Sequence, residues 1–428
     1  MLPALGTVLT EFASDILDLR PPSIATGSAL DIARSELPAR LRPAADLGIL
    51  DISEFFGETT GGVRTYLLEK AGYVQRHPML RQIMVVPGAR DEILEGGGVR
   101  CYRLHGAPIP TQKPYRFMLA TESTSRIVAH ERPNLIEIGS AWFAPWLIRL
   151  ATRRLDVPTV WFYHSNFPRI IAPRPHSAGW LRRGASAAAW RYVRRLGRLV
   201  HTTIAPSETV VQQLHTAGVE NVVCVPLGVD LDRFNPSRRG YALETRRRFG
   251  LPSGSLAMYV GRIAGEKDLD VLIRGWQPVE KRTGTRLVLV GDGPARRALA
   301  AAPGGERVIW LPFERDRERL ADLYAAVNLY VAPGPVETFG LASLEAMASG
   351  LPVLSVDQGG VSETVARSGA GAQYRSGDPA HLAEVAEQLL GTDLLSLGDL
   401  SRRYAEANHG WSTVFDRLFS VYRTVLSS

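Results

Sequence analysis

The sequence predicts an α/β protein made of two doubly wound domains that face a cleft. Its length of 428 residues is too great for one hydrophobic core and suits two α/β domains. Short apolar runs alternate with helix-like segments in both halves, which is typical of parallel sheets with crossover helices. The hydrophobic content of 45% argues against a disordered chain.

Composition limits the classes of partner and compartment. The net charge of +7 and a pI near 9.5 favour an anionic partner, such as nucleotide phosphates or an anionic lipid. Nucleic acid ranks last, because no nucleic-acid-binding motif accompanies the charge. No apolar stretch reaches the length of a membrane span and no signal-peptide pattern opens the chain. With only two cysteines, a reducing cytoplasm is the expected compartment.

The N-terminal half is predicted to hold an extension and a first domain. Residues 1–45 lack clear periodicity and contain several prolines, so we expect a poorly ordered extension or a strap on the surface. Residues 46–226 form the first domain, in which 141–155 is notably helix-like. Its predicted strands cover residues 47–52, 81–88, 99–104, 134–139, 158–163 and 222–225.

Ligands of doubly wound sheets bind beyond the carboxyl ends of the strands. Two loops of this domain that follow strands are therefore candidate ligand-binding loops. Gly61 and Gly62 follow the first strand and open a helix that contains Arg64, a geometry that faces phosphates. His164 directly follows strand 158–163 and is therefore a candidate functional residue.

Residues 180–200 are the most basic stretch of the chain. If they form a helix, one face carries Arg191, Arg194, Arg195 and Arg198. Trp180 and Trp190 suit a lipid interface. The segment is either a solvated basic face or a contact for an anionic membrane or an acidic acceptor, and the sequence leaves both open.

Residues 227–410 are predicted to form a second domain of the same kind, followed by a helix over 411–428. Arg262 and Lys267 follow its first strand, at a spacing that lets a loop arginine and a helix-start lysine converge on one anion. A planar guanidinium and a point charge make a suitable diphosphate clamp. Asp292, in the turn after the next strand, is a candidate nucleotide contact.

The most informative stretch is VAPGPVETFGLASLEAMASG, from Val331 to Gly350. It predicts the end of a strand, a tight loop and a helix over 340–347. Backbone N–H groups at the start of a helix lack intrahelical partners and favour an anion, and Gly340 leaves room for a phosphate. The anion site therefore consists of Thr338, Phe339, Gly340 and Leu341.

Two acids accompany this anion site. Glu337 lies in the loop and Glu345 lies inside the helix. If the backbone binds a phosphate, both carboxylates can hold hydroxyl groups. An anion site beside two hydroxyl-binding acids suits a sugar nucleotide.

At these residues the sequence resembles a known family. The ETFGL…LEAMASGLPV run is similar to the donor-binding signature of retaining glycosyltransferases of the GT-B fold, glycosyltransferase family 4. The resemblance extends from about Leu47 to the C-terminus. It implies two Rossmann-like domains facing a cleft, with the helix over 411–428 crossing back to the first domain. It also implies transfer of a hexose from a UDP-glucose or GDP-mannose type of donor to a hydroxyl of a glycan, lipid or small molecule, with retained configuration.

The resemblance assigns roles to the matching residues. Arg262 and Lys267 would bind the diphosphate, Glu337 the hydroxyls of the sugar, and Glu345 the ribose. His164 matches an active-site histidine that hydrogen-bonds the transferred sugar or the acceptor. The family's glycine loop, near the donor phosphates and the acceptor, corresponds to Gly61, Gly62 and Arg64. The catalytic residues would be His164, Arg262, Lys267 and Glu337.

We expect no cofactor besides the donor and no metal site. Neither DLD string, at 230–232 or 268–270, has the setting of a metal site, and the positive groups would replace a divalent cation. We expect a cytoplasmic protein, either free or peripheral at the inner face of the membrane. Two other functions stay open: a sugar-nucleotide epimerase or hydrolase on the same architecture, and a non-catalytic protein that binds membrane surfaces or carbohydrate.

Overall fold

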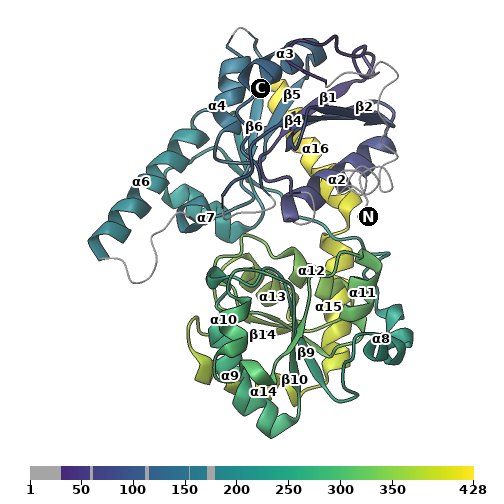
Figure 1. Cartoon of the computed structure of the whole chain (residues 1–428), viewed down its shortest axis with the longest axis vertical. Coiled ribbons are helices and arrows are strands. Elements are labelled where there is room, and N and C mark those ends of the chain that lie inside the picture. Colours follow the sequence, from purple (N-terminus) through teal and green to yellow (C-terminus); the bar gives the residue numbers. More distant parts are fainter. Residues whose placement is uncertain (1–29, 58–60, 111–114, 154, 171–178) are drawn as a thin grey trace, which may run out of the picture. The chain divides into compact units, whose positions relative to one another are not determined.

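The computed structural model describes residues 30–57, 61–110, 115–153, 155–170 and 179–428, except for the side chains of 169–170 and 179–182. Residues 1–29 of the predicted extension and 58–60 of the glycine loop therefore lie outside the described residues. The chain forms two compact units, and Figure 1 shows helices packed around the sheet of each. One unit contains the chain up to Ala205, Val211–Val225 and Phe415–Ser428; the other contains Pro206–Val210 and Pro226–Val414.

The first unit is built on a sheet with the strand order β3-β4-β2-β1-β5-β6-β7-β8. All neighbouring pairs are parallel except β3 with β4. The central strands are buried along their whole length, as expected when helices cover both faces of a sheet. The strands are β1 (Leu47–Ile52), β2 (Leu80–Gly88), β3 (Glu92–Gly96), β4 (Val99–His105), β5 (Leu135–Ile138), β6 (Thr159–Phe162), β7 (Thr202–Ala205) and β8 (Val222–Cys224).

Helices connect these strands, and most of them begin where the sequence pattern places a polar or small residue. The predicted helix over 141–155 is shorter in the structure, because Pro145 occupies its first turn and the helix ends at Ala151. The helices are α2 (Gly62–Gln75), α3 (Thr121–Glu131), α4 (Ala144–Ala151), α5 (Phe167–Ile170), α6 (Gly179–Gly197), α7 (Glu208–Thr216) and α16 (Trp411–Ser427).

The second unit is built on a fully parallel sheet with the strand order β11-β10-β9-β12-β13-β14. Its strands are β9 (Leu256–Val260), β10 (Arg286–Val290), β11 (Ile309–Leu311), β12 (Leu329–Ala332), β13 (Val353–Val356) and β14 (Gly371–Tyr374). Its helices are α8 (Ala242–Arg248), α9 (Leu269–Thr283), α10 (Arg296–Ala301), α11 (Arg317–Ala325), α12 (Leu341–Ala348), α13 (Gly360–Ser368), α14 (Pro379–Leu390) and α15 (Leu394–Asn408), with short 3₁₀ turns η1 (Pro236–Tyr241), η2 (Gly265–Lys267) and η3 (Gly305–Arg307).

Strand β3 and helix α15 are among the elements absent from the sequence prediction. Strand β3 pairs antiparallel with β4 through a two-residue turn, Gly97-Gly98, in which both residues have positive φ. Positive φ at both positions favours glycine, and this kind of turn matches the twist of a hairpin. The run Gly96-Gly97-Gly98 in the sequence could therefore have indicated the hairpin. Helix α15 begins with Asp393, whose side chain accepts hydrogen bonds from the backbone N–H groups of Leu395 and Ser396.

Residues 30–45 lie against the first unit. Ile32 is fully buried and Leu37 is nearly so. The Arg100 guanidinium donates to the carbonyl oxygen of Ala39 (2.9 Å), and the Arg126 guanidinium donates to that of Ile32 (3.0 Å). Side chains of the sheet and of α3 thus hold the backbone of this segment.

A buried polar cluster joins α16 to the first sheet. The ammonium group of Lys70 donates to Asp51 Oδ1 (2.6 Å) and to the Tyr422 hydroxyl (2.7 Å), and it lies 3.4 Å from Glu137 Oε2. The Tyr66 hydroxyl donates to Glu137 Oε1 (3.0 Å). Because all these side chains are buried, each charge depends on the others for stabilisation. Burial raises the pKa of Glu137 to about 7 despite Lys70, and the nearby Asp51 adds to the increase.

Candidate donor and acceptor sites

The second sheet has its topological switch point between β9 and β12. These two strands are neighbours, and the chain winds outward from them in opposite directions, through β10 and β11 on one side and β13 and β14 on the other. Loops at the carboxyl ends of such a strand pair diverge and leave a crevice, where ligands of this class of sheet bind.

The structure brings Lys267 and Glu337 together at this switch point. Lys267 ends η2, in the loop after β9, and Glu337 lies in the loop after β12. The Lys267 ammonium group donates to Glu337 Oε1, and both side chains keep partial exposure, 21% and 31%. A Cβ atom on Gly334 would lie 3.4 Å from Lys267 Cδ and 3.6 Å from Glu337 Cγ, so glycine leaves this pair uncrowded. The two loops therefore bring together a cation and an anion that neutralise each other.

Arg262 and Asp292 lie on two adjacent loops beside this pair. The backbone N–H of Ile263 donates to the carbonyl oxygen of Asp292 (2.9 Å). A Cβ atom on Gly291 would lie only 1.9 Å from the carbonyl oxygen of Gly261, so the two backbones meet at a distance that only glycine allows. The side chains of Arg262 and Asp292 are exposed. Among the described residues, the Arg262 guanidinium has no ion pair, so it is available to a ligand.

Gly340 precedes α12 at a position whose backbone conformation and packing both require glycine. Its φ is 89°, and a Cβ atom there would lie 2.2 Å from Val361 Cγ2. Glycine is thus needed for the left-handed backbone and for packing against α13, whatever binds nearby. The helix begins at Leu341 rather than Gly340, and Phe339 is buried beneath the loop. The Thr338 carbonyl oxygen accepts a hydrogen bond from the Ser207 hydroxyl (3.0 Å).

Glu345 is buried and held by two partners that the sequence did not reveal. The Arg317 guanidinium donates to Glu345 Oε1 (2.7 Å), and the Tyr324 hydroxyl donates to Oε2 (3.1 Å). The Arg317 guanidinium also lies 5.0 Å from the ring centroid of Phe234. Both carboxylate oxygens therefore have fixed positions. Since a carboxylate oxygen has more than one lone pair, each can accept a further hydrogen bond from a ligand hydroxyl.

The glycine loop belongs to the first unit, at the carboxyl end of β1. Gly61 precedes α2 with a φ of 129°, and Gly62 is the first residue of the helix. The Arg64 guanidinium lies 5.6 Å from the ring centroid of Phe56. The chemistry of this loop depends in part on 58–60, outside the described residues.

His164 follows β6 in the first unit and lies among aromatic rings. Its imidazole stacks parallel to the ring of Phe162, with centroids 4.1 Å apart, and lies 4.9 Å from the ring of Tyr66. Burial lowers the pKa of His164 to about 3, and the charge of Lys70 adds to the decrease. The imidazole is therefore neutral at physiological pH and can act through hydrogen bonds rather than as a cation.

A small cavity of about 10 Å³ lies beside His164, at the carboxyl ends of β5 and β6. Its walls are mainly aromatic, and Ser140 contributes a hydroxyl. The lining residues are Phe55, Gly139, Ser140, Ala141, Trp142, Trp161, Phe162, Tyr163, His164, Ser165 and Phe167.

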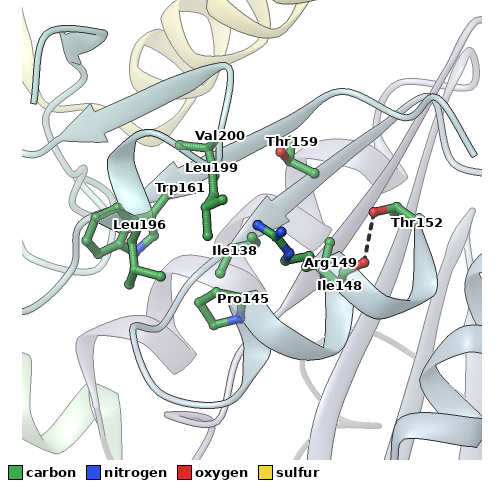
Figure 2. Close-up of a pocket in the computed structure, with 10 residues that line it drawn as sticks. All are labelled: Ile138, Pro145, Ile148, Arg149, Thr152, Thr159, Trp161, Leu196, Leu199 and Val200. Carbon is green, nitrogen blue, oxygen red and sulfur yellow. Dashed lines mark hydrogen bonds between the residues drawn. The ribbon is translucent and has the colours of Figure 1, made fainter. Parts of the chain in front are cut away.

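A larger cavity of about 100 Å³ lies between α4, the end of α6 and the sheet (Figure 2). Its walls are apolar except for Arg149, Thr152 and Thr159, and the Thr152 hydroxyl donates to the carbonyl oxygen of Ile148. Trp161 lines both cavities. None of the site residues predicted from the sequence lines the larger cavity.

Two searches of the described residues were negative. Their side chains bring together no group of three or more His, Cys, Asp or Glu residues able to hold a metal ion. None of their helices has both the length and the apolar character needed to cross a membrane.

Known proteins resemble this chain over most of its length. The family model for glycosyltransferase family 4 matches residues 60–233, and the model for glycosyl transferases group 1 matches residues 254–392. A GDP-mannose-dependent α-(1-6)-phosphatidylinositol dimannoside mannosyltransferase of Mycobacterium tuberculosis is 31% identical over 78% of this chain and 86% of its own length. The chain belongs to glycosyltransferase family 4. A D-inositol 3-phosphate glycosyltransferase of Catenulispora acidiphila is 31% identical over 67% of this chain and 71% of its own length.

Solved structures of other proteins share the fold. Sucrose-phosphate synthase from Thermosynechococcus elongatus has a TM-score of 0.73 at 21% identity, covering 89% of this chain and 99% of its own. HepE of Anabaena, solved with UDP-glucose, has a TM-score of 0.67 at 18% identity, covering 88% of this chain and 100% of its own. The predicted fold class, α/β with two Rossmann-like domains of the GT-B type, is confirmed, and so is the resemblance to family 4.

Proposed function

We propose that this glycosyltransferase moves a hexose from a nucleoside-diphosphate sugar to a hydroxyl group, with retention and without a metal ion. The observation that carries the proposal is the Lys267–Glu337 pair at the switch point of the second sheet. A donor supplies what each member of the pair needs, because its diphosphate can pair with Lys267 and its sugar hydroxyls can donate to Glu337. The GDP-mannose-dependent mannosyltransferases among the relatives make GDP-mannose the first donor to test.

The leaving diphosphate is the group that needs stabilisation during bond cleavage. Lys267, the exposed Arg262 and the backbone N–H groups at the start of α12 supply positive potential for it. These groups would take the place of a divalent cation. Departure of the diphosphate from the face that the acceptor hydroxyl approaches would let a phosphate oxygen accept the acceptor's proton, which accounts for retention without a protein nucleophile.

Glu345 is proposed to bind the ribose, with Arg317 and Tyr324 holding its carboxylate in place. His164 is proposed to hydrogen-bond the transferred sugar or the acceptor through its neutral imidazole. Gly61, Gly62 and Arg64 are proposed to approach the donor phosphates or the acceptor. Asp292, on the loop beside Arg262, is proposed as a further nucleotide contact.

The experiment that tests this function is a turnover assay with GDP-mannose and UDP-glucose, preceded by a thermal-shift panel of the corresponding nucleotides. A bound donor raises the melting temperature by mass action. Donor consumption with formation of a glycoside supports the proposal. Epimerised or hydrolysed donor, formed without an acceptor, would support the alternative of an epimerase or hydrolase.

The basic helix α6 supports a second, separable proposal, peripheral contact with an anionic membrane from the cytoplasmic side. Its described part has no acidic residue, and Arg191 and Arg195 are exposed. Co-sedimentation with anionic and with zwitterionic vesicles at low and high salt tests the contact. Binding to anionic vesicles at low salt supports it, and no binding there refutes it.

A further inference from the structure

Two buried polar atoms beside the small cavity of the first unit have no hydrogen-bond partner within the described structure. They are Glu54 Oε2 and Ser140 Oγ, on side chains that are 4% and 3% exposed. A buried donor or acceptor without a partner destabilises the folded state, so nearly all such groups in native proteins are satisfied by protein, water or ligand. Neither residue belongs to a recognisable sequence motif, and the sequence analysis did not predict a role for either.

The topology places these two residues at the switch point of the first sheet. Glu54 follows β1 and Ser140 follows β5, and these strands are neighbours. The loops after them are in contact, because the Gly139 N–H donates to the carbonyl oxygen of Ile52 (2.9 Å). This is the position at which the second unit carries its Lys267–Glu337 pair. A ligand site is therefore expected here on the same topological grounds.

The carboxylate of Glu54 is held in one orientation. Its Oε1 accepts the backbone N–H groups of Phe143 (2.6 Å) and Ala144 (2.5 Å), at the start of α4. Burial raises the pKa of Glu54 in spite of these bonds and of the nearby Ser140 hydroxyl. Ser140 is thus close enough to stabilise the carboxylate, although its hydroxyl does not reach hydrogen-bonding geometry. The Ser140 hydroxyl, which lines the cavity, has one proton to donate and lone pairs that can accept.

The cavity selects for a small, uncharged polar group. Its volume of about 10 Å³ is the space that one water molecule or one hydroxyl group fills. Among the described residues, no Arg, Lys, Asp or Glu lines it, and the imidazole of His164 is neutral. A phosphate would be too large, and none of these lining residues carries a positive charge that could compensate for it. The aromatic side chains of Trp142 and Phe167 suit the C–H face of a sugar or cyclitol ring.

We propose that this cavity binds one hydroxyl group of a neutral sugar or cyclitol acceptor, which donates to Ser140 Oγ while Ser140 donates to Glu54 Oε2. The inference rests on the proposed function and names the class of acceptor. Ser140 is the residue in direct contact, and Glu54 is a positioning residue that acts through it.

The test measures binding of methyl α-D-mannopyranoside and of myo-inositol to the whole protein by NMR titration, in the wild type and in Ser140→Ala. We expect at least one probe to bind, and its dissociation constant to rise by about fivefold in Ser140→Ala, the loss expected for one hydrogen bond. Glu54→Gln keeps an acceptor for the N–H groups of Phe143 and Ala144 and should weaken the same probe. Thr152→Ala, in the larger cavity, is the matched control and should bind the probe as the wild type does.

Three outcomes would contradict the proposal. Unchanged probe binding in Ser140→Ala, or no binding of either probe to the wild type, would mean that the cavity holds only a water molecule and would overturn the proposal. Mannose 6-phosphate is a charged probe. If it binds more tightly than the neutral probes and loses affinity in Ser140→Ala, the proposal that the acceptor is neutral is wrong. The donor is tested separately by the melting temperature of the wild type with GDP-mannose, which a bound donor raises. No rise would count against the proposed donor while leaving the probe result intact.

Discussion

The two sheets differ in the charge of the side chains at equivalent positions: one carries an ion pair and the other carries uncharged side chains. At the switch point of the second sheet, Lys267 and Glu337 are partly exposed and paired with each other. At that of the first, no charged side chain is among the described residues that line the cavity, His164 is neutral, and Lys70 lies within the buried cluster with Asp51. Both sheets place their site at the same topological position, so the difference lies in the loop residues. On the proposals made above, one edge would take charged ligands and the other would take hydroxyl groups.

The largest effect is expected from Lys70→Met, which removes the cation of the buried cluster and leaves Asp51 and Glu137 without a counter-charge. Breaking a buried ion pair from one side typically destabilises a protein by about 3–5 kcal/mol. Chemical denaturation with tryptophan fluorescence measures the change. A loss of less than about 1 kcal/mol would show that water reaches this cluster and that the contrast between the two edges is overstated.

Lys267→Ala tests the charged edge. If Lys267 stabilises the departing diphosphate, kcat/KM should fall by about 10²–10³, the loss seen on removing one preorganised electrostatic group. Because the side chain is partly exposed, the melting temperature should change little. Lys281→Ala, an exposed lysine of α9, is the control. A fall of less than fivefold in initial rate would refute the assigned role.

Glu345→Gln tests whether the buried carboxylate of Glu345 hydrogen-bonds the ribose hydroxyls. Loss of a charge-assisted hydrogen bond should weaken nucleoside-diphosphate binding by about 10–100-fold, measured by calorimetry. Tyr324→Phe keeps the charge but frees one oxygen of Glu345, so it should weaken binding by about fivefold. Arg319→Gln, on the exposed side of α11, should leave binding unchanged. Equal affinity for the ribonucleotide and its 2′,3′-dideoxy analogue in the wild type would contradict the assignment.

Glu137→Gln tests the proton held in the buried cluster. The pKa of Glu137 rises from 4.5 in the unfolded chain to about 7 in the folded protein, so the folded protein binds this proton more tightly. Its contribution to stability is therefore fully present below pH 4.5 and is lost as the pH rises through 7. The wild type should lose stability relative to Glu137→Gln between pH 5 and pH 8, measured by paired thermal melts. A constant difference would contradict the raised pKa.

The smallest effect is expected from His164→Asn, which replaces one neutral hydrogen-bonding side chain with another. If the imidazole only hydrogen-bonds, kcat/KM should fall by about fivefold. Since its pKa is near 3, the pH–rate profile of the wild type should show no His164 inflection near pH 6.5. An inflection there that disappears in His164→Asn would mean that the imidazole titrates during catalysis.

The sequence could predict elements whose signal is local. The apolar runs located the central strands, and the loops after β9 and β12 pointed to Lys267 and Glu337, which the structure brings together. It could not predict pairings between distant segments. Arg317 lies in the arginine-rich stretch FERDRERL, which resembles an exposed helix start, and only folding brings it to Glu345. Ser140 gives no signal in the sequence, because its importance comes from burial without a partner.

The ion pair of Lys267 and Glu337 has a consequence for selectivity if it binds the donor as proposed. A free hexose would then satisfy the glutamate but leave the lysine without its anion, and inorganic phosphate would do the reverse. Only a molecule that carries both groups at the right separation would replace both partners of the contact at once, so the site would discriminate against fragments of the donor.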